Sequence, residues 1–270
     1  MNPWLDPTQA ADAILRGRGR GVKIAILDSG VEVEHPDLHG LELADDLAVI
    51  EDGRQIRLVP GSGRDLYGHG TAVAWLIRSQ APEAQIGSFR VFGDSLRSRT
   101  AIVLTAARAA LERGYHVINC SLSSGIRDHW DKYKAWVDEA YLQGVHVIAA
   151  CNNQDAGRVE WPAYFTSVIA VNMARCAGPG DLYYTPGTLV EFAARGVEVP
   201  VPWAGGSARK MTGSSFAVPH VTAMVARLLS AAPGLDPLQV KCLLRTLARP
   251  CEPAVLATNV LAPNACRAVA

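Results

Sequence analysis

The sequence predicts an α/β fold with a mostly parallel central sheet and helices on both faces. Short apolar runs rich in Val and Ile alternate along the chain with patterns of helical period, the order that right-handed βαβ units produce. Of the 270 residues, 49% are apolar, which is enough for a large core. No repeat, low-complexity block or change of composition marks a linker, so we expect residues 1–270 to form a single domain.

The expected elements follow from the apolar period and from the residues that bound each run. Residues 22–28 are a β-branched apolar run that ends in Asp28, which indicates a buried parallel strand. Residues 100–113 are rich in Ala and Leu, which favours a helix, and the helix expected over 130–143 ends at Gly144. The remaining expected elements are helices over 8–16, 72–77, 217–229 and 236–248, and strands over 86–92, 117–122, 145–151 and 167–171.

Less regular segments connect and flank these elements. An Arg/Gly-rich link follows the first helix, so that helix and link together occupy residues 1–21. Residues 41–59 alternate less cleanly and are expected to form short strands and loops. A Pro-containing tail over 250–270 is expected to wrap the surface.

Charge and hydropathy exclude several classes of protein. Lys plus Arg and Asp plus Glu number 26 each, so the formal net charge is zero and no nucleic-acid footprint is indicated. No apolar run approaches the length of a membrane span. We therefore expect neither nucleic acid nor membrane as a partner, and the sequence indicates no oligomeric state.

The cysteines and the amino terminus favour a cytoplasmic location. Six cysteines, at positions 120, 151, 176, 242, 251 and 266, show no metal-site or redox-motif spacing. Cys120 and Cys151 end apolar runs, as buried free thiols do. The first seven residues lack the basic start and apolar core of a signal peptide. These features favour a reducing compartment, although a chain trimmed of its export signal would look the same.

A polar cluster at residues 211–216 runs directly into a helical pattern. Apolar residues recur every three or four positions over 217–229. We expect Ser214 or Ser215 to cap this helix and Pro219 to fall in its first turn. A serine hydroxyl there lies near unpaired N–H groups and the positive end of the helix dipole, which suits a nucleophile whose attack creates an oxyanion. An ordinary capping serine is the alternative interpretation.

Two further polar residues stand at the ends of elements. Asp28 closes a predicted strand, and His69 lies between two glycines at the start of a predicted helix. In open α/β sheets, functional groups gather at the carboxyl ends of strands. Alone, Asp28 is equally well a turn cap and His69 a structural histidine. Together with a helix-start serine, they supply the acid, base and nucleophile that an activated serine requires.

Three motifs in the order Asp, His, Ser resemble those of the subtilisin-like serine peptidases. The matching stretches are residues 25–30 with 35–38, 67–73 and 213–220, and two supporting strands match over 117–122 and 149–153. The resemblance covers roughly residues 8–248. It implies a subtilisin-like fold and a serine protease that hydrolyses peptide bonds in protein or peptide substrates through an acyl-enzyme, with no cofactor.

The resemblance also implies a role for each matching residue. Ser215 attacks the scissile carbonyl, His69 takes its proton and later gives it to the leaving amine, and Asp28 orients His69. The Asn153 side chain and the Ser215 N–H bind the oxyanion, a type of contact that contributes about 3–4 kcal/mol. Asn152 is the alternative donor, but the register of the match favours Asn153.

The chain departs from the family pattern near the site. Ser214 stands where the family usually has Thr, and Asn152 stands where the family usually has Gly. The family also usually has Gly directly after the Ser-Leu pair, and this chain has Ser123 there. The loop over 78–82 is shorter than the loop that wraps calcium in secreted members. Asp37 matches one calcium ligand, but its partner loop is missing, so we expect no metal there and only a turn role for Asp37. The chain also begins close to the catalytic region, so we expect it to fold without the prodomain of secreted members.

The resemblance places the pocket for the side chain before the cut between three stretches of chain. Its expected lining residues are Ser121, Leu122, Ser123, Ala150, Cys151, Asn152, Asp155 and Glu160. Matching Trp161-Pro162 to the family's aromatic-Pro pair puts Glu160 at the pocket base, with Asp155 near the rim. A carboxylate in a partly desolvated pocket favours a cation, so we expect a preference for Arg or Lys before the scissile bond. If both acids lie on a mobile surface loop instead, no such preference follows.

The predicted function is therefore a cytoplasmic endopeptidase that processes few targets. Two alternatives keep the same residues. A catalytically silent subtilisin-like module would bind peptides without cutting them. A macrocyclase would pass the acyl-enzyme to a peptide amine, because the first half of its mechanism is the same.

Overall fold

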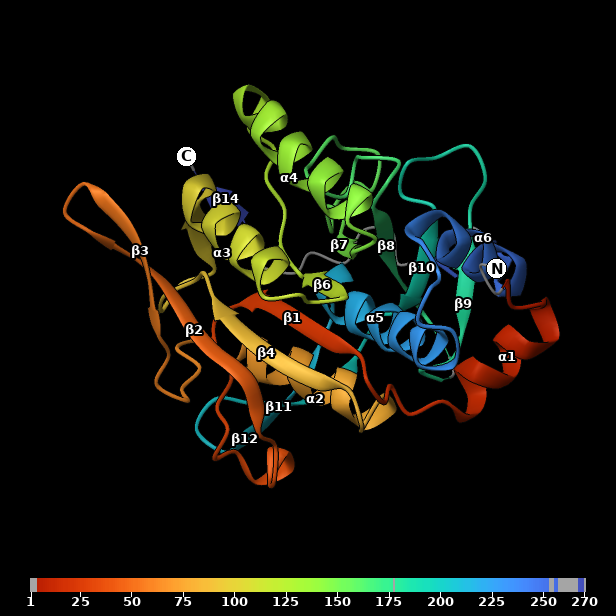
Figure 1. Ribbon diagram of the computed structural model, residues 1–270, viewed down its shortest axis with the longest axis horizontal. Coiled ribbons are helices and arrows are strands. Elements are labelled where there is room, and N and C mark those ends of the chain that lie inside the picture. Colours follow the sequence, from red (N-terminus) through yellow and green to blue (C-terminus); the bar gives the residue numbers. More distant parts are fainter. Residues whose placement is uncertain (1–3, 177, 253–254, 257–266, 270) are drawn as a thin grey trace.

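The computed structural model describes residues 4–176, 178–252, 255–256 and 267–269. Its helices are α1 (Pro7–Arg16), α2 (His69–Gln80), α3 (Thr100–Glu112), α4 (Trp130–Leu142), α5 (Ser214–Ala231) and α6 (Pro237–Leu247). Its strands are β1 (Lys23–Asp28), β2 (Leu43–Asp52), β3 (Gln55–Pro60), β4 (Gln85–Arg90), β5 (Arg97–Arg99), β6 (Val117–Cys120), β7 (His146–Ala150), β8 (Ile169–Ala174), β9 (Leu182–Tyr184), β10 (Phe192–Arg195), β11 (Val199–Trp203), β12 (Ser207–Met211), β13 (Arg249–Pro250) and β14 (Arg267–Val269). Figure 1 shows the central sheet with its helices, which confirms the predicted α/β class.

The central sheet contains ten strands in the order β13-β9-β10-β8-β7-β6-β1-β4-β2-β3. From β10 to β2, every neighbouring pair is parallel. Within this sheet, antiparallel pairing is confined to β9 with β10 and to β2 with β3. Because the parallel strands end on the same side, the carboxyl ends of β1, β6 and β7 meet at one edge of the sheet, where α/β proteins place their functional groups.

The sheet is buried on both faces. In β1, Ile24 and Ile26 pack into the core under α1, α2, α5 and α6, whereas Ala25 and Leu27 pack into the core under α3 and α4. This alternation is what a two-residue side-chain period produces in a parallel strand. It explains why the strand reads as a continuous apolar run in the sequence.

Helix α5 lies at the centre of one core, against β6, β7, β8 and β10 and against α1 and α2. Its N-cap is Gly213, whose backbone is extended, and Ser214 and Ser215 are already helical. The prediction that a serine caps this helix is therefore wrong. Pro219 lies inside the helix, beyond the predicted first turn. Its missing N–H leaves the Ser215 carbonyl for another donor, and the Ser121 hydroxyl donates to it at 3.0 Å.

The segment over 41–59, predicted to form short strands and loops, forms most of an antiparallel hairpin with longer strands than predicted. Strands β2 and β3 pair antiparallel and are joined by Gly53 and Arg54. Gly53 has a φ of 62°, the left-handed backbone that a tight hairpin turn requires. The hairpin packs against α3 and projects at the left of Figure 1.

Other differences concern boundaries and missed strands. Strand β6 ends at Cys120, so Ser121 and Leu122 leave the sheet, and β8 begins at Ile169. Strands β9, β10, β11 and β12 lie between 182 and 211, where the sequence pattern predicts none. The predicted tail over 250–270 falls largely outside the described residues.

Two predictions about composition bear on the environment of the protein. Cys120 and Cys151 are buried free thiols, as predicted, and Cys176, Cys242 and Cys251 are also unpaired. The sixth cysteine, Cys266, lies outside the described residues. In the described part of the chain, none of the helices combines the length and the apolar character that a membrane crossing needs.

Candidate active site

The carboxyl end of β1 places Asp28 in a buried network. Its Oδ1 and Oδ2 lie 2.8 and 2.9 Å from Nδ1 of His69, and the carboxylate is only 1% exposed. Oδ1 also accepts the Ser29 N–H at 2.8 Å, while the Ser29 hydroxyl accepts the Gly70 N–H at 3.0 Å. Ser29 thus ties the end of β1 to the first turn of α2, and this holds Asp28 and His69 in register.

Two glycines allow His69 to start α2 in this position. A Cβ at Gly68, which has a φ of 111°, would come within 2.6 Å of Nε1 of Trp203, and a Cβ at Gly70 within 2.0 Å of the Gly30 carbonyl oxygen. Neither position therefore has room for a side chain. Because an ionised carboxylate only accepts hydrogen bonds, the imidazole proton facing Asp28 sits on Nδ1, and Nε2 is the basic nitrogen.

Ser215 is the second residue of α5 and lies at the same sheet edge. Its hydroxyl donates to the Ser121 carbonyl at 3.2 Å, and the residue is 6% exposed. Phe216 follows it, with its ring centroid 5.1 Å from that of His69. This ring contact brings the start of α5 beside the catalytic imidazole candidate. Asp28, His69 and Ser215, from three separate segments, are thus assembled in one place.

Asn153 is oriented by the residue before Ser215. Its Oδ1 accepts the Ser214 N–H at 2.7 Å and lies 2.8 Å from the Ser214 hydroxyl, which is also 2.7 Å from the Cys151 carbonyl. Both neighbours of Oδ1 are donors, so the amide oxygen faces Ser214 and Nδ2 points elsewhere. Nδ2 lies 3.3 Å from where a Cβ of Gly213 would stand. Gly213 therefore leaves space in front of the amide donor.

Asn152 makes a different set of contacts from Asn153. Its Nδ2 donates to Oε1 of Glu160 at 2.7 Å, and its Oδ1 accepts the N–H groups of Gln154 and Asp155 at 2.9 and 3.0 Å. Both ends of this amide are engaged in holding the loop that follows β7. Of the two candidates, Asn153 is the one whose amide donor is not used in these loop contacts.

A small pocket opens beside Ser215 and collects most of the predicted substrate-binding residues. It is lined by Ser121, Leu122, Ser123, Ala150, Cys151, Asn152, Asn153, Glu160, Ser214 and Ser215. Glu160 is 5% exposed, and its carboxylate accepts the Ser123 hydroxyl on one oxygen and the Asn152 amide on the other. Nε of the half-exposed Arg158 lies 3.7 Å from Oε1. The carboxylate thus connects the two walls of a pocket whose volume is only about 10 Å³.

Two of the predicted pocket residues need comment. Asp155 is exposed, is not among the lining residues, and accepts the Gly157 N–H at 2.9 Å, so the structure does not bring it to the pocket. Cys151 does line the pocket, but burial raises the pKa of its thiol to about 12. At neutral pH the thiol is therefore protonated and unsuited to act as a nucleophile.

The predicted turn residue Asp37 lies at the surface of the protein. Its side chain is 55% exposed, and its N–H donates to Nδ1 of His35 at 3.1 Å. Across the described residues, no group of three or more His, Cys, Asp or Glu side chains is placed to hold a metal ion.

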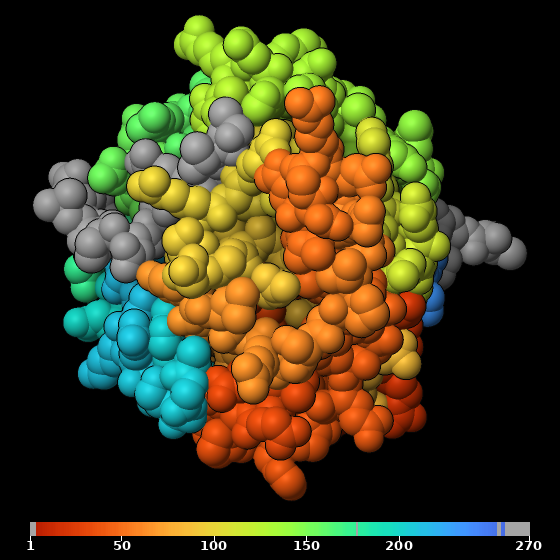
Figure 2. Space-filling model, turned by 90° about the vertical axis from the view of Figure 1, so that its left-hand side faces the viewer, coloured from red at the N-terminus to blue at the C-terminus, as the bar shows by residue number. Residues whose placement is uncertain are grey.

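An aromatic wall that the sequence analysis missed flanks His69 on the side of Phe216. It consists of Trp203, Tyr67 and Phe216; the Trp203 ring lies 6.3 Å from the His69 ring and 5.7 Å from that of Tyr67. Trp203 ends β11, in a hairpin with β12 that packs on α2. This hairpin falls in the cyan area of Figure 2, next to the orange segment that precedes α2. The alternating apolar residues at 199, 201 and 203 were the signal that could have revealed it.

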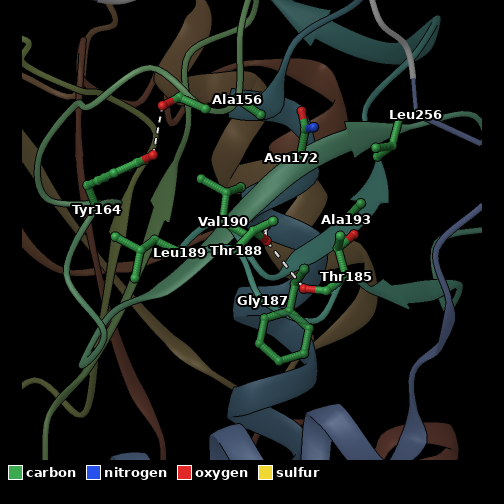
Figure 3. Close-up of a pocket in the computed structure, with 12 residues that line it drawn as sticks. Ala156, Tyr164, Asn172, Thr185, Gly187, Thr188, Leu189, Val190, Ala193 and Leu256 are labelled. Atoms are coloured by element: carbon green, nitrogen blue, oxygen red, sulfur yellow. Dashed lines mark hydrogen bonds between the residues drawn. The ribbon is translucent and has the colours of Figure 1, made fainter. Parts of the chain in front are cut away.

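A second cavity, of about 320 Å³, lies away from Ser215, beside the loop that follows Asn153. Figure 3 shows its mostly apolar lining, with the Tyr164 hydroxyl donating to the Gly157 carbonyl and the Thr188 hydroxyl to Thr185. Its lining residues include no His, Asp, Glu, Lys, Arg or Cys. The acid–base candidates Asp28 and His69 therefore do not line this cavity.

Comparison with known proteins gives a consistent result. Residues 19–265 match the subtilase family. The chain is 30% identical over 252 residues to subtilisin Savinase of Lederbergia lenta, with 88% of each chain covered, and 30% identical to M-protease of Shouchella clausii (strain KSM-K16). The match to M-protease covers 88% of this chain but only 62% of the length of M-protease. The crystal structure of a cold adapted subtilisin-like serine proteinase aligns with a TM-score of 0.70 and 26% identity, over 86% of this chain and 83% of that one.

Proposed function

The chain belongs to the subtilase family of serine proteases, and from this premise we propose that it is an endopeptidase that cuts after Arg or Lys. Membership of this family establishes the class of reaction, which is the hydrolysis of peptide bonds by a serine protease. The observation that carries the catalytic roles is the pairing of Asp28 with His69, whose Nδ1 lies 2.8 and 2.9 Å from the two carboxylate oxygens.

In the proposed mechanism, Ser215 is the nucleophile. Nε2 of His69 accepts the proton of the Ser215 hydroxyl as Oγ attacks the scissile carbonyl, and Asp28 stabilises the imidazolium that forms. The same proton then passes to the leaving amine. A water molecule repeats the attack on the acyl-enzyme and releases the second product.

Asn153 and the start of α5 are proposed to stabilise the oxyanion. The contacts of Ser214 with Oδ1 of Asn153 leave the amide Nδ2 as the donor for a developing negative charge. The N–H of Ser215 belongs to the first turn of α5, where backbone donors have no partner within the helix and the helix dipole is positive. Donors held in place before the reaction are the main source of such stabilisation.

Glu160 is proposed to select the residue before the cut. The pocket volume of about 10 Å³ is roughly what one water molecule requires, so a substrate side chain has to displace lining groups, and we expect these to be Ser123 and Asn152, which now contact Glu160. A Lys or Arg head group brings its own N–H donors to the carboxylate and replaces the contacts from Ser123 and Asn152. An apolar side chain would leave a buried carboxylate without those contacts, which is costly.

The catalytic proposal is tested by labelling and by product mass. A fluorophosphonate probe should label the wild-type protein and fail to label Ser215→Ala, because only an activated serine reacts. Absence of labelling in the folded wild type would favour a silent peptide-binding module. Products of a linear peptide should gain one water on cleavage, whereas a cyclic product without that gain would identify a macrocyclase.

The specificity proposal is tested by a cleavage profile over a peptide library. Wild type should prefer Arg and Lys before the cut, and Glu160→Gln should lose most of that preference. Asp155→Asn is the matched control, because it removes an exposed carboxylate two residues from Asn153. A wild-type preference for Leu, Phe or Tyr, or a basic preference that survives Glu160→Gln, would remove Glu160 from this role.

We also propose that the enzyme acts in the cytoplasm as a processing protease. The support is chemical: the five described cysteines, at 120, 151, 176, 242 and 251, are all unpaired, as in a reducing compartment. Fractionation of the source cells with an antibody to the protein tests this. Recovery of the protein from the culture medium would contradict it.

A further inference from the structure

Different kinds of side chain surround Ser215. Asn153 and the Glu160 carboxylate line the pocket beside it. Trp203 and Phe216 pack around the His69 ring, and Tyr67 contacts Trp203, so these three rings form the aromatic wall. Because the imidazole delivers the proton to the leaving amine, the chain after the scissile bond departs on the His69 side. The aromatic wall therefore borders the path of the leaving peptide.

Arg209 is stacked on this wall. Its guanidinium carbon lies 4.9 Å from the centre of the Trp203 ring, and the residue is exposed. Trp203 itself is 3% exposed and packs directly over Gly68, so it is a rigid support. Within the described part of the chain, none of the ion pairs involves the Arg209 guanidinium.

The register of the hairpin shows which cation faces the wall. Arg209 pairs with Val201, a buried residue of the cluster that holds Trp203 and Phe216. The next residue, Lys210, pairs with the exposed Pro200 and therefore points to the opposite face of the hairpin. The two neighbouring cations thus differ in whether they border the reaction site.

We propose that Arg209 selects substrates with Asp or Glu at the second or third position after the scissile bond. The Trp203 ring lies 6.3 Å from the His69 ring, and the Arg209 guanidinium carbon lies 4.9 Å from the Trp203 ring. At about 3.3 Å per residue of extended chain, this path accommodates two to three residues. A guanidinium held against an indole ring by a cation–π contact can offer its N–H groups to a carboxylate at a reduced entropic cost. The inference rests on the proposed protease function and extends it to the leaving side.

The test is a peptide series with one fixed sequence before the cut and Asp, Gln or Lys at the second and third positions after it. Wild type should cleave the Asp peptides about three- to fivefold faster, in kcat/KM, than the Gln peptides, as expected for a partly exposed ion pair. Arg209→Gln should abolish this preference, and Arg209→Glu should invert it in favour of Lys. Raising the salt to 1 M shortens the Debye length to about 3 Å and should shrink the wild-type preference.

Lys210→Glu is the matched control and should leave the preference unchanged, because its side chain faces away from the wall. Indifference of the wild type to charge at these positions would overturn the inference, as would equal shifts from Arg209→Glu and Lys210→Glu. Rates on the Gln peptides and fluorophosphonate labelling report on the protease itself. If both remain while the charge preference is absent, only this inference fails; if neither is seen in the wild type, the proposed function fails as well.

Discussion

His69 and His220 are two buried histidines on two helices that pack together, but a carboxylate faces the first ring and an amide faces the second. His69, at the start of α2, is 3% exposed and faces the Asp28 carboxylate. His220, in α5, is 2% exposed, and its Nδ1 faces the Gln80 amide at 2.8 Å. In the described structure its Nε2 has no hydrogen-bond partner, and burial lowers the pKa of the ring to about 3.

Burial, with the nearby charge of Arg195 in addition, keeps His220 neutral, whereas a facing carboxylate is what makes a buried histidine a useful base. Only the carboxylate can stabilise the imidazolium that forms when the ring takes a proton. The same division recurs in two neighbouring pairs. Ser215 and Asn153 face the proposed reaction, whereas Ser214 and Asn152 hold their neighbours in place. Substitutions in these pairs should therefore separate loss of activity from loss of stability.

The largest effect is expected for Ser215→Ala. It should lower kcat by about 10⁴-fold or more while the melting temperature stays close to that of wild type, because the hydroxyl, which donates to the Ser121 carbonyl, lies at a helix start and not in the apolar core. Ser214→Ala should keep measurable activity, since its N–H still holds Oδ1 of Asn153. Steady-state kinetics and thermal melts of both variants check this. An inactive Ser214→Ala beside an active Ser215→Ala would shift the nucleophile by one residue.

A smaller loss of activity is expected for Asn153→Ala. Removing one oxyanion donor should lower kcat by about 10²–10³-fold with little change in KM. Asn152→Ala should act mainly on stability, by about 1–3 kcal/mol, because it leaves Oε1 of Glu160 without its buried donor. Urea unfolding measures the second effect. If the kinetic losses of the two variants were reversed, Asn152 would be the oxyanion donor.

The stability of the fold should fall in acid because of its interior histidines. Burial lowers the pKa of His220 to about 3 and that of His146 to about 4, against an ordinary value of 6.5. Above pH 6.5 both rings are neutral whether the chain is folded or not, so they add no pH dependence. Below pH 6.5, the two histidines bind protons in the unfolded chain but stay neutral in the folded protein. Each histidine therefore lowers the free energy of unfolding by about 1.4 kcal/mol for each unit that the pH falls, until its folded pKa is reached.

Urea unfolding of the inactive Ser215→Ala protein at pH 7, 6, 5 and 4 checks this slope without self-digestion. Adding His220→Leu should flatten the pH dependence, because the unfolded chain then has one imidazole fewer to protonate. The fold should tolerate this change, since Gln80 keeps its second hydrogen bond, from Nε2 to the Leu76 carbonyl at 2.7 Å. A slope unchanged by that substitution would show that His220 titrates normally in the folded protein.

The smallest effect is expected on removal of metal ions. Excess EDTA should barely change the melting temperature of Ser215→Ala. A tight site, with ligand far above its dissociation constant, would contribute several kcal/mol and so several degrees. A fall of about ten degrees or more would reveal a calcium site that the residues around Asp37 did not predict.

The fold and the candidate triad could be predicted because their signals are local. Asp28 ends a contiguous apolar run, and His69 lies between glycines that the structure needs for close approach to Gly30 and Trp203. The helix cap was mispredicted because capping preferences are averages, and here the Ser214 hydroxyl serves Asn153 and Cys151 instead.

The aromatic wall could not be found in this way. Trp203 reaches His69 only through the packing of a hairpin on α2, a contact between distant segments that no short motif records. The position of Asp155 was missed for a similar reason. Its side chain turns to the Gly157 N–H of its own loop, a local choice that depends on the path of the loop through space.

The central position of α5 determines when the protein can become active during its synthesis. In the chain, Asp28 and His69 precede β6, β7, β8 and β10, whereas Ser215 follows all four strands, and its helix docks against them. A chain made only as far as β10 therefore holds the proposed acid and base without the proposed nucleophile. Domains generally fold as units as they emerge, so the proposed hydrolysis must wait until α5 has been made and has docked.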